Sequence, residues 1–198
     1  RLVADMLKTA GAHRIMTVDL HTDQIQGFFD GPVDHLLANK VLAEHLRDTY
    51  ADFDLAVVAP DSGRVRVAEK WADTMGGVPL AFIHKTRDKT RPNEVAANRV
   101  VGEVAGRTCI LVDDMIDTGG TIAKATEALL ADGAKDVVIA ATHGVLSGPA
   151  VQRLSTCGAR EVIVTNTLPI PDEKRFPSLT VLSIAPVIAR AVREVFED

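Results

Sequence analysis

Three aspartates, two glycines and two threonines lie close together in residues 109–122, which read CILVDDMIDTGGTI. An apolar run leads into the adjacent carboxylates of Asp113 and Asp114, and a turn and a helical pattern follow. Glycine lets backbone amides approach an anion closely, and the N-terminus of a helix adds partial positive charge. The segment therefore predicts a phosphate site. Its anion-binding residues are expected to be Asp117, Thr118, Gly119, Gly120 and Thr121.

The two carboxylates before this turn suit the hydroxyls of a sugar, which donate hydrogen bonds, or a Mg²⁺ ion carried by a phosphate. The segment is not a Walker A loop, because it has no GxxxxGK[ST] pattern, and it is not GxGxxG. The plain alternative is a tight turn in which Thr121 merely caps a helix. Three aspartates within five residues disfavour that alternative, because their mutual repulsion requires a counter-charge.

Histidine and further aspartates follow two other apolar runs and suggest a metal site. Neutral imidazole and carboxylates bind divalent cations or the waters around them. From the residues alone, a hydrogen-bonded structural role explains His21 better than metal binding does, and Asp61 is equally well explained as a helix cap. The candidate metal ligand among these residues is His21, with Asp19, Asp30 and Asp34 as further candidates.

A basic loop is expected at residues 85–98, which contain no core positions. Lys85 and Arg87 stand two residues apart near its start. Fixed cations stabilise the charge that moves onto phosphate oxygens during phosphoryl transfer. A solvated loop without a catalytic role is the alternative from the residues alone.

The elements that must position these residues alternate between strand and helix. Apolar, β-branched runs predict the strands, and apolar residues at helical spacing predict the helices. Asp34 is expected to cap a helix that extends to residue 50. The alternation predicts an α/β fold, a doubly wound parallel sheet whose ligands lie at the carboxyl ends of its strands. The expected strands are 14–20, 55–60, 79–84, 108–112, 136–142, 161–165 and 180–184.

Composition narrows the class of protein further. The 198 residues are 46% hydrophobic and 25% charged, which is typical of a globular domain. A formal net charge of −5 argues against nucleic acid or an anionic membrane as a partner. No apolar run is long enough for a membrane span, no signal peptide is visible, and the two cysteines have no metal-like spacing. A cytoplasmic location is therefore expected.

Several segments together resemble one enzyme family. Residues 109–122 resemble the phosphoribosyl-diphosphate signature shared by type I phosphoribosyltransferases and ribose-phosphate diphosphokinases. Residues 18–34, VDLHTDQIQGFFDGPVD, are similar to a segment that the ribose-phosphate diphosphokinases supply for Mg²⁺-ATP. Residues 59–73 resemble the family's Pro-Asp-x-Gly segment, which implies that Asp61 is a metal ligand. Arg64 stands where many members of the family have a second glycine. Residues 84–94 resemble its catalytic loop.

The resemblance covers the chain from Arg1 to Asp198 and implies a phosphoribosyltransferase type I-like fold of the bacterial kind. It implies transfer of the diphosphoryl group of ATP to ribose 5-phosphate, with Lys85 and Arg87 catalytic, Mg²⁺ as cofactor and a role in nucleotide biosynthesis. Arg87, Asp113 and Asp114 are expected to bind ribose 5-phosphate together with residues 117–121. The family forms hexamers, so a homo-oligomer is expected.

The resemblance also implies a division into two domains. Residues 1–36 are expected to be the end of an N-terminal phosphoribosyltransferase-like domain that is mostly absent, because the chain opens inside a helical pattern. Residues 37–198 are expected to form the C-terminal domain with the ribose 5-phosphate loop. Two rival interpretations remain: a type I phosphoribosyltransferase, which consumes the diphosphate, and a non-catalytic regulatory relative. The segment at residues 18–34 disfavours the first, and the retained Lys85 and Arg87 disfavour the second.

Overall fold

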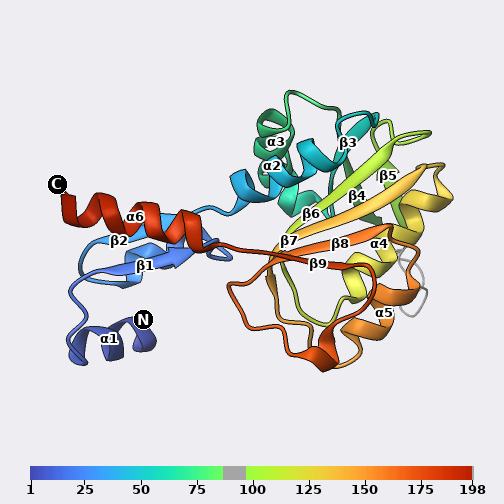
Figure 1. Cartoon of the computed structure of the whole chain (residues 1–198). Helices are drawn as coiled ribbons and strands as arrows, with labels where there is room; N and C mark the ends of the chain where they lie inside the picture. Colours follow the sequence, from blue (N-terminus) through green and yellow to red (C-terminus); the bar gives the residue numbers. More distant parts are fainter. Residues whose placement is uncertain (87–96, 198) are drawn as a thin grey trace. The chain divides into compact units, whose positions relative to one another are not determined.

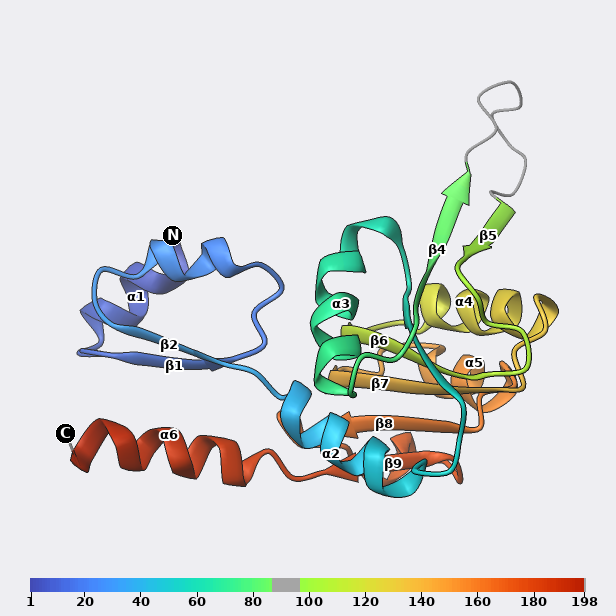
Figure 2. The ribbon, with the colours of Figure 1, turned by 90° about the horizontal axis from the view of Figure 1, so that it is seen from above.

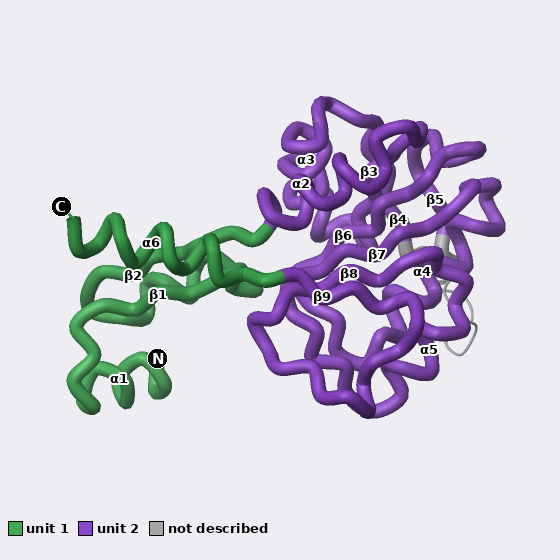
Figure 3. The backbone as a smooth tube through the Cα atoms, in the orientation of Figure 1, with its two compact units in different colours: residues 1–38, 183–198 green, residues 39–182 purple. Residues whose placement is uncertain are grey.

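Two compact units make up the chain, as Figure 3 shows: residues 1–38 with 183–198, and residues 39–182. The computed structural model describes residues 1–86 and 97–197. Within these ranges, no helix is both long and apolar enough to span a membrane.

The larger unit is built on a seven-stranded sheet with the order β5-β4-β3-β6-β7-β8-β9 (Figure 1). Every neighbouring pair is parallel except β4 and β5, which are antiparallel. The strands are β3 (Leu55–Ala59), β4 (Leu80–Thr86), β5 (Ala97–Val101), β6 (Thr108–Ile116), β7 (Asp136–Gly144), β8 (Glu161–Thr165) and β9 (Leu179–Leu182).

Helices cover both faces of this sheet, as Figures 1 and 2 show. Helices α4 and α5 lie on one face and share a buried apolar cluster with the strands, and α2 and α3 lie on the other. The helices are α2 (Asn39–Thr49), α3 (Val65–Thr74), α4 (Gly120–Ala131) and α5 (Ala150–Thr156), with short 3₁₀ turns η2 (Ser62–Arg64) and η3 (Asp172–Lys174). The predicted α/β doubly wound sheet is therefore confirmed.

The central strands are buried in the way their composition predicts. All five residues of β3 are buried, as are the first five of β6, because helices exclude water from both faces of a parallel sheet. Both cysteines are free and buried: Cys109 lies in β6, and Cys157 follows α5. Burial raises the pKa of the Cys109 thiol to about 12.

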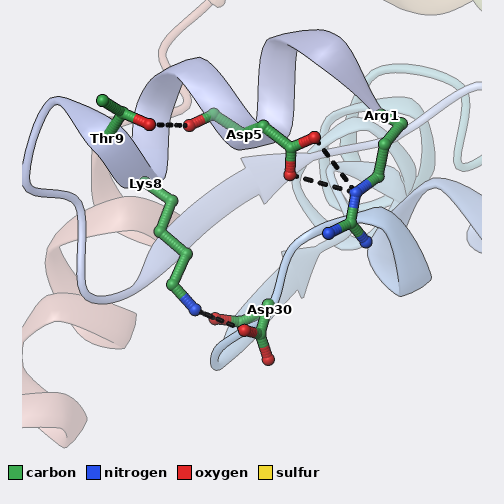
Figure 4. Close-up of polar contacts among 5 residues, drawn as sticks. All are labelled: Arg1, Asp5, Lys8, Thr9 and Asp30. Atoms are coloured by element: carbon green, nitrogen blue, oxygen red, sulfur yellow. Dashed lines mark hydrogen bonds and ion pairs between the residues drawn. The ribbon is translucent and has the colours of Figure 1, made fainter.

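The smaller unit contains α1 (Leu2–Thr9), β1 (Ile15–Val18), the 3₁₀ helix η1 (Asp23–Phe28), β2 (Val33–Leu36) and α6 (Ala185–Glu197). Strands β1 and β2 pair in parallel. Figure 4 shows two ion pairs of α1. Lys8 Nζ lies 2.5 Å from Asp30 Oδ2, and Nε of Arg1, the N-cap residue, lies 3.0 Å from Asp5 Oδ1. Residues 183–198 belong to the same compact unit as residues 1–38. The domain division expected from the sequence places them with residues 37–182 instead.

Two expectations about local structure are wrong. Asp34 does not begin a helix: it lies in β2, paired in register with Met16, and α2 begins at Asn39. Its carboxylate accepts hydrogen bonds from the Arg14 guanidinium, at 2.5 and 2.8 Å, so a partner distant in sequence takes the place of the helix N-terminus. The expected loop at 85–98 also overlaps strand, because β4 runs to residue 86 and β5 begins at residue 97.

Candidate active site

Strand β6 carries Asp113 and Asp114 to the carboxyl edge of the sheet. It lies between β3 and β7 and is parallel to both, so residues that follow β3 emerge at the same edge. The side chains of Asp113 and Asp114 are only 16% and 9% exposed. The backbone N–H of Asp114 donates a 2.9 Å hydrogen bond to Asp113 Oδ1, which fixes the orientation of the first carboxyl group.

Arg64 brings a positive charge to this carboxylate pair from the end of η2. Its Nη2 donates to Asp114 Oδ1 at 2.7 Å, and its Nε lies 3.5 Å from Asp113 Oδ1. Burial, together with the neighbouring Asp114 carboxylate, raises the pKa of Asp113 to about 7, although Arg64 and the Asp114 amide act in the opposite direction. Asp113 therefore changes charge near neutral pH.

The raised pKa of Asp113 makes stability depend on pH. A carboxyl group whose folded pKa of about 7 exceeds its unfolded value of 3.8 destabilises the fold increasingly as pH rises through this range. The Asp113→Asn variant carries no charge and escapes that loss. We expect its melting temperature, relative to wild type, to rise by about 3 °C or more between pH 5 and pH 8. Thermal unfolding followed by circular dichroism measures this difference, and parallel pH curves for the two proteins would contradict it.

The loop after β6 has the backbone of an anion-binding turn. Gly119 has a left-handed φ of +70°, and it occupies the N-cap position of α4 without a side-chain cap. Thr121 is therefore not the cap that the plain-turn alternative required. The first N–H groups of a helix have no partner within the helix, and they carry partial positive charge. The side chains of Asp117, Thr118 and Thr121 are exposed.

Contacts from the next loop and from α5 hold this turn in place. The backbone N–H of Ser147 donates to the Asp117 carbonyl at 3.0 Å. The Arg153 guanidinium of α5 donates to the Thr118 carbonyl at 3.0 Å. Neither Arg64 nor Arg153 was predicted as a site residue. Arg64 had one signal in the sequence, its departure from the family's glycine, and Arg153 had none.

Asp61 follows β3 at the same edge of the sheet and caps η2. Its Oδ1 accepts a 2.9 Å hydrogen bond from the Gly63 N–H, which is the capping role that the residues alone allowed. A carboxylate offers about four lone-pair sites, so one accepted hydrogen bond does not exhaust the group. Capping and metal binding are thus compatible for Asp61, and metal binding stays a prediction.

The other candidate metal ligands lie in the smaller unit. Asp19 Oδ2 accepts a 2.9 Å hydrogen bond from the Ala38 N–H. Hydrogen bonds from Lys8 and from Arg14 lower the pKa values of Asp30 and Asp34 respectively. His21 is exposed. Among residues 1–86 and 97–197, no three His, Cys, Asp or Glu side chains form a metal cage. Mg²⁺ commonly uses one or two carboxylates together with water and substrate phosphates, so the Asp61 carboxylate fits its chemistry, and metal binding by His21 stays a prediction.

The predicted catalytic cations lie where the structure describes little. Lys85 is the second-to-last residue of β4, so its backbone lies at the carboxyl end of a strand parallel to β3. This edge also carries Asp61, Asp113 and Asp114. Arg87 lies outside the described residues, and both catalytic roles stay predictions.

Comparison with known proteins finds a matching family and highly similar relatives. A family described as the phosphoribosyl synthetase-associated domain matches residues 84–198. Ribose-phosphate pyrophosphokinases are 72% identical over 198 residues in Mycobacterium tuberculosis (strain ATCC 25618 / H37Rv) and 66% identical over 200 residues in Bifidobacterium longum. Both alignments cover 100% of this chain, which spans 61% and 59% of the two relatives.

A solved structure agrees in both sequence and fold. It is the crystal structure of phosphoribosylpyrophosphate synthetase from Mycobacterium smegmatis, with a TM-score of 0.92 and 71% sequence identity. The match covers 99% of this chain and 63% of the synthetase chain. The chain therefore shares the α/β fold of that synthetase, as the alternation of strands and helices predicts. The chain belongs to the phosphoribosyl synthetase-associated domain family.

Proposed function

We propose that this chain is part of a ribose-phosphate diphosphokinase, a transferase of nucleotide biosynthesis. The enzyme transfers the diphosphoryl group of ATP to the C1 hydroxyl of ribose 5-phosphate and produces 5-phosphoribosyl 1-diphosphate and AMP. One observation carries the proposal: at the edge of the sheet, the Asp113–Asp114 pair is followed closely by the N-terminus of α4, whose N-cap is Gly119 in a left-handed conformation. Relatives with the corresponding enzyme names support it.

The geometry suits a sugar phosphate. The backbone amides at the start of α4, with the hydroxyls of Thr118 and Thr121, bind the 5-phosphate. The carboxylates of Asp113 and Asp114 accept hydrogen bonds from the ribose 2- and 3-hydroxyls. Arg153 and Ser147 hold the phosphate loop in this conformation before the ligand arrives, which lowers the entropy cost of binding.

The reaction is an in-line displacement at the β-phosphorus of ATP. The C1 hydroxyl oxygen forms a bond to the β-phosphorus and loses its proton to solvent. The bond between the β-phosphorus and the α,β-bridging oxygen breaks, and AMP leaves with that oxygen. Lys85 and Arg87 stabilise the negative charge that develops on the phosphate oxygens. No covalent enzyme intermediate is required, so catalysis consists of alignment and electrostatic stabilisation.

Mg²⁺ is the proposed cofactor, with His21 and Asp61 as its ligands from this chain. When bound, the ion neutralises part of the triphosphate charge. Asp61 is suited to this role because its cap hydrogen bond to Gly63 orients the carboxylate group.

Phosphorus NMR of the full-length protein with ATP, Mg²⁺ and ribose 5-phosphate tests the proposed reaction. We expect new diphosphate resonances on the sugar together with AMP, and no AMP when ribose 5-phosphate is omitted. Formation of ADP in place of AMP would contradict diphosphoryl transfer. Consumption of 5-phosphoribosyl 1-diphosphate with a nucleobase would instead indicate a phosphoribosyltransferase, and ligand-shifted resonances without turnover would indicate a regulatory relative.

We also propose that the whole protein is a cytoplasmic homo-oligomer, a hexamer by family resemblance. Light scattering during size-exclusion chromatography measures the number of subunits.

A further inference from the structure

Arg64 is the residue of the candidate site that the proposed mechanism does not use. It ends η2, between β3 and α3, and its side chain is only 19% exposed. Its guanidinium contacts both members of the carboxylate pair, at 2.7 Å from Asp114 Oδ1 and 3.5 Å from Asp113 Oδ1. Arg64 is therefore directed into the group that is proposed to bind the sugar, and away from bulk solvent.

Two adjacent, largely buried carboxylates have the chemistry of a divalent cation site. Oxygen ligands with negative charge are what Mg²⁺ and Mn²⁺ prefer. A guanidinium at the same oxygens changes that preference, because arginine keeps its charge at every accessible pH. The guanidinium occupies oxygen lone pairs that a metal ion would need. Its positive charge also repels a metal ion at the same oxygens, and partial burial strengthens that repulsion. A neutral sugar hydroxyl meets no such repulsion.

We propose that Arg64 is a specificity-determining residue, an internal cation that excludes divalent metal from the Asp113–Asp114 carboxylates and reserves them for the hydroxyls of ribose 5-phosphate. The inference rests on the proposed function for the identity of the sugar phosphate. The exclusion of metal rests on the ion pairs themselves.

Mn²⁺ titration of the full chain without ATP, followed by electron paramagnetic resonance, tests the exclusion. The Arg64→Gln variant removes the charge and keeps a polar side chain of similar reach. We expect it to gain one Mn²⁺ site that is at least about tenfold tighter than any corresponding binding in wild type. The double variant Arg64→Gln/Asp114→Asn is expected to lose that site, and Arg64→Lys to bind Mn²⁺ as wild type does. Equal Mn²⁺ binding by wild type and Arg64→Gln would overturn the proposal.

A second comparison does not depend on Arg64→Gln being folded. If Arg64 keeps metal away from the pair, Asp114→Asn in the otherwise native chain leaves Mn²⁺ stoichiometry and affinity unchanged. Loss of a Mn²⁺ site in this variant would show that the pair binds metal in the presence of Arg64, and would overturn the proposal.

Kinetics separate this role from a merely structural ion pair. In Arg64→Gln, free Mg²⁺ competes for the carboxylates, so KM for ribose 5-phosphate is expected to rise with free Mg²⁺, whereas wild type and Arg64→Lys show no such rise. A KM in Arg64→Gln that does not change with free Mg²⁺ would contradict the proposal. The Mn²⁺ titrations require no turnover, so they decide the role of Arg64 even where the phosphorus NMR experiment shows that the proposed reaction fails.

Discussion

Replacing Lys85 by alanine is expected to lower kcat for diphosphoryl transfer by about 10²- to 10³-fold. KM for ribose 5-phosphate is expected to change by less than about threefold, because an interaction made mainly in the transition state affects kcat and leaves ground-state binding nearly intact. The position of the residue supports this role: β4 carries its backbone to the edge of the sheet where β6 carries Asp113 and Asp114.

Steady-state kinetics with saturating Mg²⁺-ATP measure this effect. Lys124→Ala is the matched control, because Lys124 is an exposed lysine of α4 and its loss removes the same formal charge. We expect the control to keep kcat near the wild-type value. A Lys85→Ala variant with normal kcat and a strongly raised KM would assign Lys85 to substrate binding instead of catalysis.

Replacing Gly102 by alanine is expected to destabilise the fold by about 3 kcal/mol, and to lower the melting temperature by about 6–12 °C. Gly102 directly follows β5 and has φ of +115°, a conformation that L-residues rarely adopt. An added Cβ would lie 2.7 Å from Ala81 Cβ and 2.9 Å from the Leu80 carbonyl oxygen. Because Leu80 and Ala81 begin β4, the variant must displace β5 from β4.

Gly106→Ala separates the two causes of this destabilisation. Gly106 lies in the same connection and also has a positive φ, of +75°, but an added Cβ has no neighbour within 4 Å. It therefore suffers backbone strain without a clash, and we expect a loss of only about 1 kcal/mol. Thermal unfolding of both variants measures the difference. Equal melting temperatures would show that the contact with β4 is unimportant.

Much of the fold follows from short stretches of sequence. Strands β3, β6, β7 and β8 were predicted because each is a nearly continuous apolar run, and each is buried. The turn after β6 was predicted because glycine in a DTGGT sequence allows the left-handed conformation that Gly119 adopts. These features depend on local chemistry, which is why the sequence alone reveals them.

The features that were missed depend on residues far apart in the chain. The contact between Arg64 and Asp114 joins positions 50 residues apart. Asp34 was assigned to a helix N-terminus because a short acidic side chain is typical there, but the pairing of β2 with β1 placed it beside Arg14. In both cases a tertiary contact, which no local pattern encodes, determines the environment of the carboxylate.

The two buried cysteines provide a built-in reporter of local opening. Alkylating reagents attack the thiolate, and Cys109, with its pKa raised to about 12, forms almost none at neutral pH while it is buried. Cys157 is also buried, and its thiol donates to the Leu154 carbonyl at 3.4 Å. Cys109 lies in the strand that leads to the phosphate loop, and Cys157 follows the helix whose Arg153 holds that loop. The rate at which each thiol is labelled therefore measures how often the scaffold on either side of the ligand loop opens.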